Sequence, residues 1–190
     1  MRTRSNSNRQ NMEQLIISSA RTSFESKGVA RTTVTDIARE ANITRELFYY
    51  YFRSKDEVKQ RVLKEYSAEG QQYAKQWIES QSDGSGTFGD FVQIFRKYLF
   101  GEDGSGAVHS VLMETGEIYN VLWDTIKESV ELMKGTKVFE NFEKLSTSSA
   151  EIAMAFVLYG TLGFLEQKET VNDEVIAETV KAAFGCKDVK

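Results

Sequence analysis

The stretch at residues 33–57 constrains the fold of this chain more than any other. It begins and ends with a capping box, at 33–36 and 54–57, the pattern in which two residues exchange hydrogen bonds at the start of a helix. Between a first short helix, at about 33–40, and the second box there is room for one turn and one further helix. We therefore predict two short helices joined by residues 41–43. This is a helix-turn-helix, whose second helix enters the major groove of DNA.

The predicted turn needs a residue that tolerates a positive φ angle. Asn42 lies at its centre, and Asn adopts such angles more readily than most residues because its short side chain bonds locally. Ala38 is small, as is required where the two helices cross closely. Both residues therefore favour the helix-turn-helix.

Five consecutive aromatic residues, 48–52, occupy the second helix. By propensity such a run favours a β-strand, but the available length predicts one helix. At about 100° per residue the run divides between two faces. The face toward the preceding helices holds Thr44, Phe48, Tyr51 and Phe52, and the opposite face holds Arg45, Glu46, Tyr49 and Tyr50.

The rest of the chain also has helical spacing, and no proline interrupts it. A helix that opens at Asn11 and ends at Gly28 carries apolar residues at every fourth position: Met12, Ile16, Ala20 and Phe24. With the later segments, this predicts an all-α chain of about nine helices. The longest nearly apolar run, 153–165, has 13 residues, whereas a membrane span needs about 20. We therefore expect a buried helix there.

Charge divides the chain into two parts. Residues 1–66 hold 13 Lys and Arg against 8 Asp and Glu, whereas residues 67–190 hold 11 against 20. A basic module that binds a polyanion, joined to an acidic remainder, explains this division. Chance segregation of surface charge is the alternative. We predict a basic flexible arm at 1–11, the DNA-binding domain at 12–53 and a helical domain at 54–190.

The remaining patterns do not indicate an enzyme. Cys186 is the only cysteine, which excludes an internal disulfide and favours a reducing compartment. His109 is the only histidine, and neither residue has metal-ligand companions. The glycines at 84–89 satisfy a dinucleotide-binding pattern, but a charged helical segment precedes them instead of a strand. We therefore expect no catalytic residue, metal or cofactor, and a cytoplasmic location.

Residues 32–55, TTVTDIAREANITRELFYYYFRSK, resemble the DNA-binding segment of the tetracycline-repressor (TetR) family of transcription regulators. The matching residues are Thr33, Ile37, Ala38, Ala41, Ile43, Thr44, Phe48, Tyr49, Tyr51, Phe52, Ser54 and Lys55. The resemblance covers residues 12–66. It implies a prokaryotic regulator, usually a repressor, that binds a palindromic operator as a homodimer and is released by a small molecule.

Two other classes of function stay open. The first is a DNA-binding protein of the same fold without a small-molecule effector, which acts in the nucleoid or through a protein partner. The second is an all-α enzyme or scaffold. A palindromic binding site would favour a DNA-binding protein, with or without an effector, over the enzyme or scaffold. A ligand effect on DNA binding would separate a regulator with an effector from one without.

The predicted DNA-contacting residues lie in the helix-turn-helix and at the start of the next helix: Thr33, Thr44, Arg45, Glu46, Leu47, Tyr49, Tyr50 and Lys55. The hydroxyls of Tyr49 and Tyr50 suit phosphate oxygens, which position a helix without reading sequence. Thr33 and Lys55 are phosphate-contact candidates because they stand at helix starts.

Glu46 and Leu47 depart from the family, in which their positions commonly carry a small residue and then threonine or asparagine. A carboxylate repels phosphates but accepts a hydrogen bond from cytosine N4, and Leu47 suits a thymine methyl group. One hypothesis is that this pair sets operator specificity, with Arg45 reading guanine or holding a phosphate. The alternative is that Glu46 forms an ion pair with Arg45 or Arg53 and points away.

Three arginines, Arg2, Arg4 and Arg9, lie in the N-terminal arm. They suit the DNA minor groove, as basic arms do in other DNA-binding domains. An unattached basic tail is the alternative.

In the acidic part, the resemblance implies a dimer interface and a ligand pocket. Small residues and their apolar neighbours suggest the interface: Ala153, Phe156, Gly160, Gly163, Phe164, Ile176 and Val180. Aromatic and Met residues suggest the pocket: Phe91, Phe95, Tyr98, Met113, Tyr119, Trp123 and Met133. Both sets also fit an ordinary intramolecular core. Glu114 and Glu117 suit a cationic ligand if buried, and are solvated acids otherwise.

Overall fold

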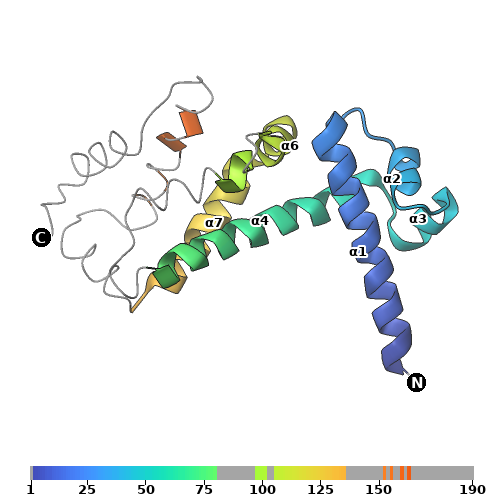
Figure 1. Cartoon of the computed structure of the whole chain (residues 1–190), viewed down its shortest axis with the longest axis horizontal. Helices are drawn as coiled ribbons and strands as arrows, with labels where there is room; N and C mark the ends of the chain where they lie inside the picture. Colours follow the sequence, from blue (N-terminus) through green and yellow to red (C-terminus); the bar gives the residue numbers. More distant parts are fainter. Residues whose placement is uncertain are drawn as a thin grey trace, which may run out of the picture. The chain divides into compact units, whose positions relative to one another are not determined.

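The computed structural model describes residues 2–80, 97–101 and 105–135, with isolated positions at 152, 155, 159, 160, 162 and 163. Every regular element in these ranges is a helix (Figure 1), which confirms the predicted all-α class. The predicted number of nine helices includes segments outside the described residues. No helix within these ranges is long and apolar enough to cross a membrane.

The helices follow one another as α1 (Arg2–Lys27), α2 (Val34–Glu40), α3 (Arg45–Tyr51), α4 (Lys55–Ser80), α6 (Ala107–Thr115) and α7 (Ile118–Met133). Residues 97–100 form a further helical turn. Helix α1 begins at Arg2, so the prediction that it opens at Asn11 is wrong. The basic segment before Asn11 contains neither glycine nor proline, and the helix continues through it.

The chain divides into two compact units. The first contains residues 1–66 and 100–121, and the second contains residues 67–99 and 122–190. Helix α4 therefore contributes its first part to one unit and its remainder to the other. Helix α6 belongs to the first unit, where it packs against α1, and the predicted domain boundaries at 12–53 and 54–190 stay a prediction.

The core of the first unit is built on the apolar stripe of α1. Ile16, Ala20 and Phe24 are almost completely buried, as their spacing predicts, while Met12 is half-buried. Helices α2 and α3 add Ile37, Ala38, Phe48 and Phe52, and α4 adds Val58, Val62 and Tyr66. This core fixes α2 and α3 relative to α1.

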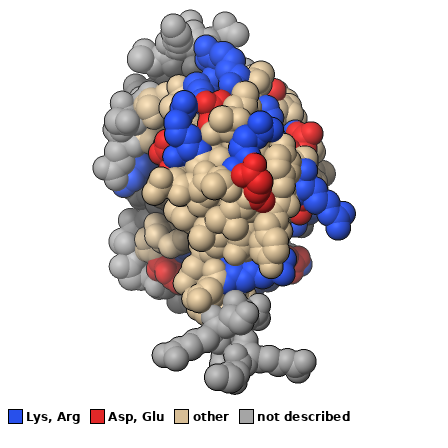
Figure 2. All heavy atoms as spheres, turned by 90° about the vertical axis from the view of Figure 1, so that its right-hand side faces the viewer, with Lys and Arg blue, Asp and Glu red and all other residues tan. Residues whose placement is uncertain are grey.

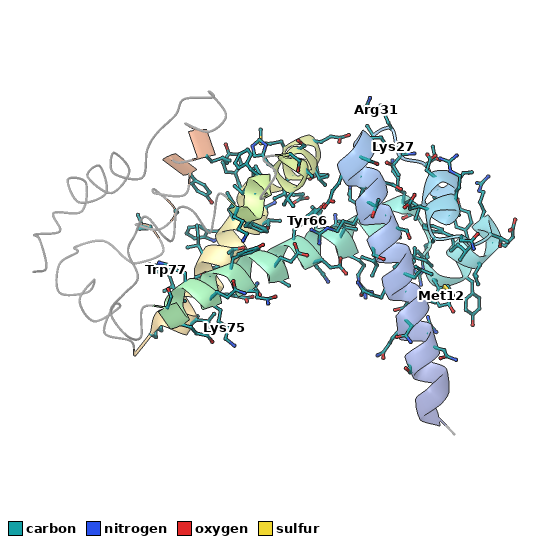
Figure 3. The ribbon with its side chains drawn as sticks, in the orientation of Figure 1. Met12, Lys27, Arg31, Tyr66, Lys75 and Trp77 are labelled. Atoms are coloured by element: carbon teal, nitrogen blue, oxygen red, sulfur yellow. The ribbon has the colours of Figure 1, made fainter. Side chains whose placement is uncertain are left out.

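Tyr66 joins α4 to α1 (Figure 3). Its ring is fully buried, and its hydroxyl donates a 2.9 Å hydrogen bond to the carboxylate of Glu25. The same carboxylate oxygen accepts from Nε of Arg21 at 2.8 Å, and the Arg21 guanidinium carbon lies 4.8 Å from the centre of the Tyr66 ring. Because the buried hydroxyl has a partner, Tyr66 anchors α4 without leaving a polar group unsatisfied.

In the second unit, α4 and α7 approach each other closely at Gly70. A Cβ atom at Gly70 would lie 2.9 Å from Oγ1 of Thr125, so only glycine fits at this distance. Tyr98 is buried beside the same contact. A groove of about 400 Å³ also lies between the two helices, lined by Ala68, Gln71, Gln72, Lys75, Glu128, Glu131 and Leu132.

The predicted ligand-pocket residues do not line this groove. Tyr98 is buried in the core, whereas the exposed fractions of Met113, Tyr119 and Trp123 are 42%, 55% and 37%. The side chain of Met133 and the residues Phe91 and Phe95 lie outside the described part of the chain. The pocket stays a prediction.

The predicted dimer interface falls mostly outside the described residues, namely at Ala153, Phe156, Phe164, Ile176 and Val180. Gly160 and Gly163 are described, and a Cβ atom at either would meet no atom of the described residues within 4 Å. The close packing expected at these glycines is thus not found within the described chain, and their role in a dimer stays a prediction.

Candidate nucleic-acid interface

Helix α2 begins at the predicted capping box. The hydroxyl of Thr33 accepts from the N–H of Asp36 at 3.2 Å, and the Asp36 carboxylate accepts from the N–H of Thr33 at 2.9 Å. Nζ of Lys27 and Nη2 of Arg39 each lie 2.9 Å from the other oxygen of Asp36. These bonds hold the pKa of Asp36 well below its usual range, with the Lys27 bond as the largest cause. The start of α2 is therefore a saturated cluster of hydrogen bonds.

The turn after α2 has the predicted geometry. Asn42 has a φ of 53° and is the only non-glycine residue with positive φ among the described residues. The N–H of Ile43 then donates to the carbonyl of Ala38 at 2.9 Å, which closes the end of α2. Thr44 caps the next helix, because its hydroxyl accepts from the N–H of Leu47 at 3.2 Å. The helix-turn-helix is confirmed.

The two predicted faces of α3 are confirmed for seven of their eight residues. Phe48 and Phe52 are buried, and Tyr51 is half-buried. Arg45, Glu46, Tyr49 and Tyr50 are exposed. Thr44 was expected on the inner face but is exposed, because it caps the helix instead of packing in the core.

The exposed face of α3 combines aromatic and charged side chains. Tyr49 is 48% exposed and Tyr50 is 71% exposed. Their rings contact neighbours edge to face, Tyr49 with Phe48 at 5.5 Å and Tyr50 with Tyr51 at 5.1 Å between ring centres. Figure 2 shows the end of the molecule that carries α3, where basic side chains surround a largely uncharged area. Such a surface can approach a polyanion and leave tyrosine hydroxyls available.

Glu46 interacts with the start of its own helix. The Glu46 backbone N–H, followed by the Thr44 hydroxyl, holds the pKa of the carboxyl group below its ordinary value. Among the described residues no ion pair joins Glu46 to Arg45 or Arg53, although the charge of Arg45 also lowers the pKa of Glu46. The carboxylate is therefore ionised, exposed and an acceptor only. Whether Glu46 reads a base stays a prediction.

The two residues predicted to bind phosphate at helix starts are engaged within the protein. Thr33 directs both its backbone N–H and its hydroxyl to Asp36. Nζ of Lys55 donates to the carbonyls of Val29 and Thr32 at 2.8 and 2.9 Å. One of the three N–H groups of Lys55 remains for another acceptor. Their contact with DNA stays a prediction.

Glu114, on α6, has a structural role that the sequence did not indicate. Its two carboxylate oxygens accept the N–H groups of Val29 and Ala30 at 2.8 and 2.6 Å. These bonds, Ala30 first, lower the pKa of Glu114. The expectation that Glu114 pairs with a cationic ligand is thus not supported by its contacts. Glu117 accepts from the side-chain amide of Asn120 at 2.8 Å.

The connection between α1 and α2 is therefore held on both sides. Lys55 binds its carbonyl groups and Glu114 binds its N–H groups, so α4 and α6 together set where α2 begins. No sequence signal could reveal the Glu114 contact, because the two partners are 85 residues apart.

No group of three or more His, Cys, Asp and Glu side chains suited to a metal occurs in the described ranges.

Comparison with known proteins agrees with this geometry. Residues 16–62 match the family described as bacterial regulatory proteins, tetR family. The transcriptional regulator TtgR and the probable regulator ArpR, both from Pseudomonas putida, are each 46% identical to this chain over 48 residues. That match covers 25% of this chain and 23% of each relative, so it spans less than a quarter of their length.

Similar solved structures cover much more of the chain. The multidrug-binding protein EbrR complexed with imidazole has a TM-score of 0.67 and 16% identity, over 93% of this chain and 97% of its own. RolR in complex with resorcinol has a TM-score of 0.65 and 17% identity, over 96% of this chain and 91% of its own. NalD is the secondary repressor of the MexAB-OprM multidrug efflux pump in Pseudomonas aeruginosa. Its TM-score is 0.58 and its identity 19%, over 93% of this chain and 96% of its own. These similarities show the fold.

The sequence match and the fold lead to the same assignment. The match begins and ends within the first unit and contains the whole helix-turn-helix. The resemblance is therefore confirmed for residues 16–62, which match the family described as bacterial regulatory proteins, tetR family.

Proposed function

We propose that this protein is a transcriptional repressor that binds a palindromic operator as a homodimer and releases it when a small molecule binds. Helix α3 enters the major groove, and two copies read the two half-sites about one DNA turn apart. The site of action is the cytoplasm of a prokaryote.

The arrangement of α3 carries the proposal. Phe48 and Phe52 fix the helix in the core, and the turn at Asn42 sets its direction. This leaves Arg45, Tyr49 and Tyr50 exposed together on one short helix. An arginine suits guanine or a phosphate, and tyrosine hydroxyls suit phosphates.

Within this proposal, Glu46 determines operator sequence. Its carboxylate lacks an ion-pair partner among the described residues and has no donor of its own to offer a phosphate. An ionised acceptor in the groove favours cytosine, whose N4 amino group donates. Leu47, half-buried beside it, favours a thymine methyl group.

The names of the structural neighbours support a small-molecule effector. EbrR is described as multidrug-binding, and RolR as bound to resorcinol. Both share the fold of this chain over more than nine-tenths of its length. The effector acts by binding one conformation of the dimer better, and so changes the separation of the two α3 helices.

Selection of binding sites from random double-stranded DNA tests the proposal. We expect a palindromic consensus with two half-sites, and DNA affinity that falls steeply with salt. No enrichment over non-specific binding would refute it. The variant Glu46→Ala should change the consensus at one position in each half-site, and an unchanged consensus would exclude direct reading by that carboxylate.

The same assay separates the proposed function from its alternative. Pools of small molecules are added to the complex of protein and selected operator, and release is measured. Release by a compound supports the ligand-responsive repressor. Stable binding against every pool would favour a regulator of the same fold that responds to a protein partner.

A further inference from the structure

Helix α1 extends well beyond the domain that it helps to build. Its first buried residue is Ile16, which is also where the family match begins, yet the helix starts at Arg2. The segment before Ile16 is about 20 Å long at 1.5 Å per residue. Residues 7–11 are all exposed. The core of the first unit therefore does not require this extension.

The extension is basic. Arg2, Arg4 and Arg9 precede the first acidic residue, Glu13, so residues 1–12 carry three positive side chains and no negative one. Positions 2 and 9 are two helical turns apart and lie on the same side of the helix. Three positive residues with no acid among them suit a polyanion more than they suit the solvated end of a helix.

Arg9 retains donors for such a partner. Its side chain is 58% exposed, and its guanidinium binds Glu13 through Nε at 3.0 Å. Among the described residues, no acceptor bonds to its two Nη groups. A planar guanidinium with free Nη groups can donate two hydrogen bonds to one phosphate.

The extension lies beside the candidate DNA-binding face. The hydrogen bond to Glu13 and the charge of Glu13 raise the pKa of Arg9, so its guanidinium is positively charged. Met12, one turn further along, extends from α1 on the side of α3 (Figure 3). Arg9 and Tyr50 are both exposed on the first unit, although they are 41 positions apart in the sequence.

We propose that the N-terminal extension of α1 is a second DNA-contacting element, which binds the sugar–phosphate backbone flanking the base pairs that α3 contacts. This inference rests on the proposed function and adds a contact outside the family-matched segment. Arg9 is the arginine of this extension whose contacts the structure describes, and positions 2 and 4 precede it on the same helix. DNA presents about one negative charge per 1.7 Å of its axis, so a helix of this length passes several phosphates.

The test compares operator duplexes that share the selected palindrome but have short or long flanks. Binding is measured by fluorescence anisotropy over a range of salt concentrations, with wild type, Arg9→Gln and the triple variant R2Q/R4Q/R9Q. Lys127→Gln is the matched control, because it also removes one exposed positive charge paired with an acid, Asp124, on α7. Circular dichroism verifies that each variant is folded.

We expect wild type to bind the long duplex more tightly than the short one. The triple variant should lose roughly tenfold in affinity for the long duplex, and its salt slope should shrink by about 0.9 for each phosphate contact removed. Arg9→Gln should show part of both effects, and Lys127→Gln neither. For the short duplex the loss should be smaller.

Two outcomes would overturn the inference in distinguishable ways. If wild type binds the palindrome while the triple variant keeps its affinity, salt slope and flank dependence, the extension does not contact DNA and the proposed function stands. If wild type selects no palindrome at all, the proposed function and this inference fail together.

Discussion

Glu114 and Lys55 bind the two backbone polar groups of the same residue. The Glu114 carboxylate accepts the N–H of Val29 at 2.8 Å, and the Lys55 ammonium donates to the Val29 carbonyl, also at 2.8 Å. One ligand comes from α6 and the other from α4. The connection before α2 thus depends on charged side chains from two distant segments of the chain.

The variant Glu114→Gln should destabilise the protein. A Gln amide is neutral and has one acceptor oxygen, so both N–H groups, of Val29 and Ala30, lose a charged partner and one of them loses its acceptor altogether. We expect a loss of about 1 kcal/mol in the free energy of unfolding, since both groups lie close to solvent. Urea unfolding measures it, with Glu117→Gln as the control, because among the described residues that carboxylate binds only an exposed amide.

The effect of Glu114→Gln should depend on pH. The pKa of Glu114 is lowered in the folded protein relative to its ordinary value of 4.5. Such a carboxyl group contributes stability above its unfolded pKa and loses that contribution as the pH falls through its folded pKa. The difference in the free energy of unfolding between wild type and variant should therefore be largest at neutral pH and should decrease below pH 4.5. A constant difference down to acidic pH would contradict the assigned contact.

Gly28→Ala should be more harmful than its backbone angle alone explains. Gly28 has a φ of 86°, and an added Cβ would lie 2.8 Å from Oε2 of Glu114. We expect a loss of about 2 kcal/mol in the free energy of unfolding, from backbone strain together with displacement of the carboxylate.

Gly116→Ala is the matched control for Gly28→Ala. Gly116 has a φ of 70°, but a Cβ there would meet nothing within 4 Å among the described residues. It should lose only the strain energy, about 1 kcal/mol. In a Glu114→Ala background the further cost of Gly28→Ala should fall to that of Gly116→Ala. Equal costs for both glycines in the wild-type background would argue against the steric contribution.

Asn42 should tolerate glycine better than alanine. Its φ of 53° strains a residue with a Cβ, and Asn offsets that strain with local hydrogen bonds that Ala lacks. We expect Asn42→Ala to lower the free energy of unfolding by about 1 kcal/mol, and Asn42→Gly to change it by less than about 0.5 kcal/mol. Thermal unfolding measures both. If alanine were the better substitute, the turn would not depend on positive φ.

Tyr50→Phe should weaken operator binding without affecting folding. Tyr50 is 71% exposed, so removing its hydroxyl should leave the free energy of unfolding unchanged. If that hydroxyl donates to a phosphate, affinity should fall about threefold to tenfold, as expected for one hydrogen bond to a charged group. Anisotropy with the selected operator measures it. Tyr73→Phe, a half-buried tyrosine on α4, is the control and should leave affinity unchanged.

Local features of this protein were predictable from sequence because their partners are close along the chain. The cap at Thr33 and the turn at Asn42 each depend on residues three to five positions away. The division of α3 into a buried and an exposed face follows from the period of a helix, so Phe48 and Tyr50 could be assigned to opposite faces. The one error on α3, Thr44, arose because periodicity does not distinguish a capping residue from a packed one.

Tertiary structure alone decided the contacts between distant segments. The sequence shows Glu114 as one acid among many, and nothing in its neighbourhood indicates that its acceptors face the N–H groups of Val29 and Ala30. Lys55 was predicted to bind phosphate because it stands at the start of a helix, yet it bonds to backbone carbonyls across 26 and 23 residues. Backbone N–H and C=O groups are the same in every residue, so a side chain that binds them leaves no pattern in the sequence. Its partner becomes known only when the helices are packed.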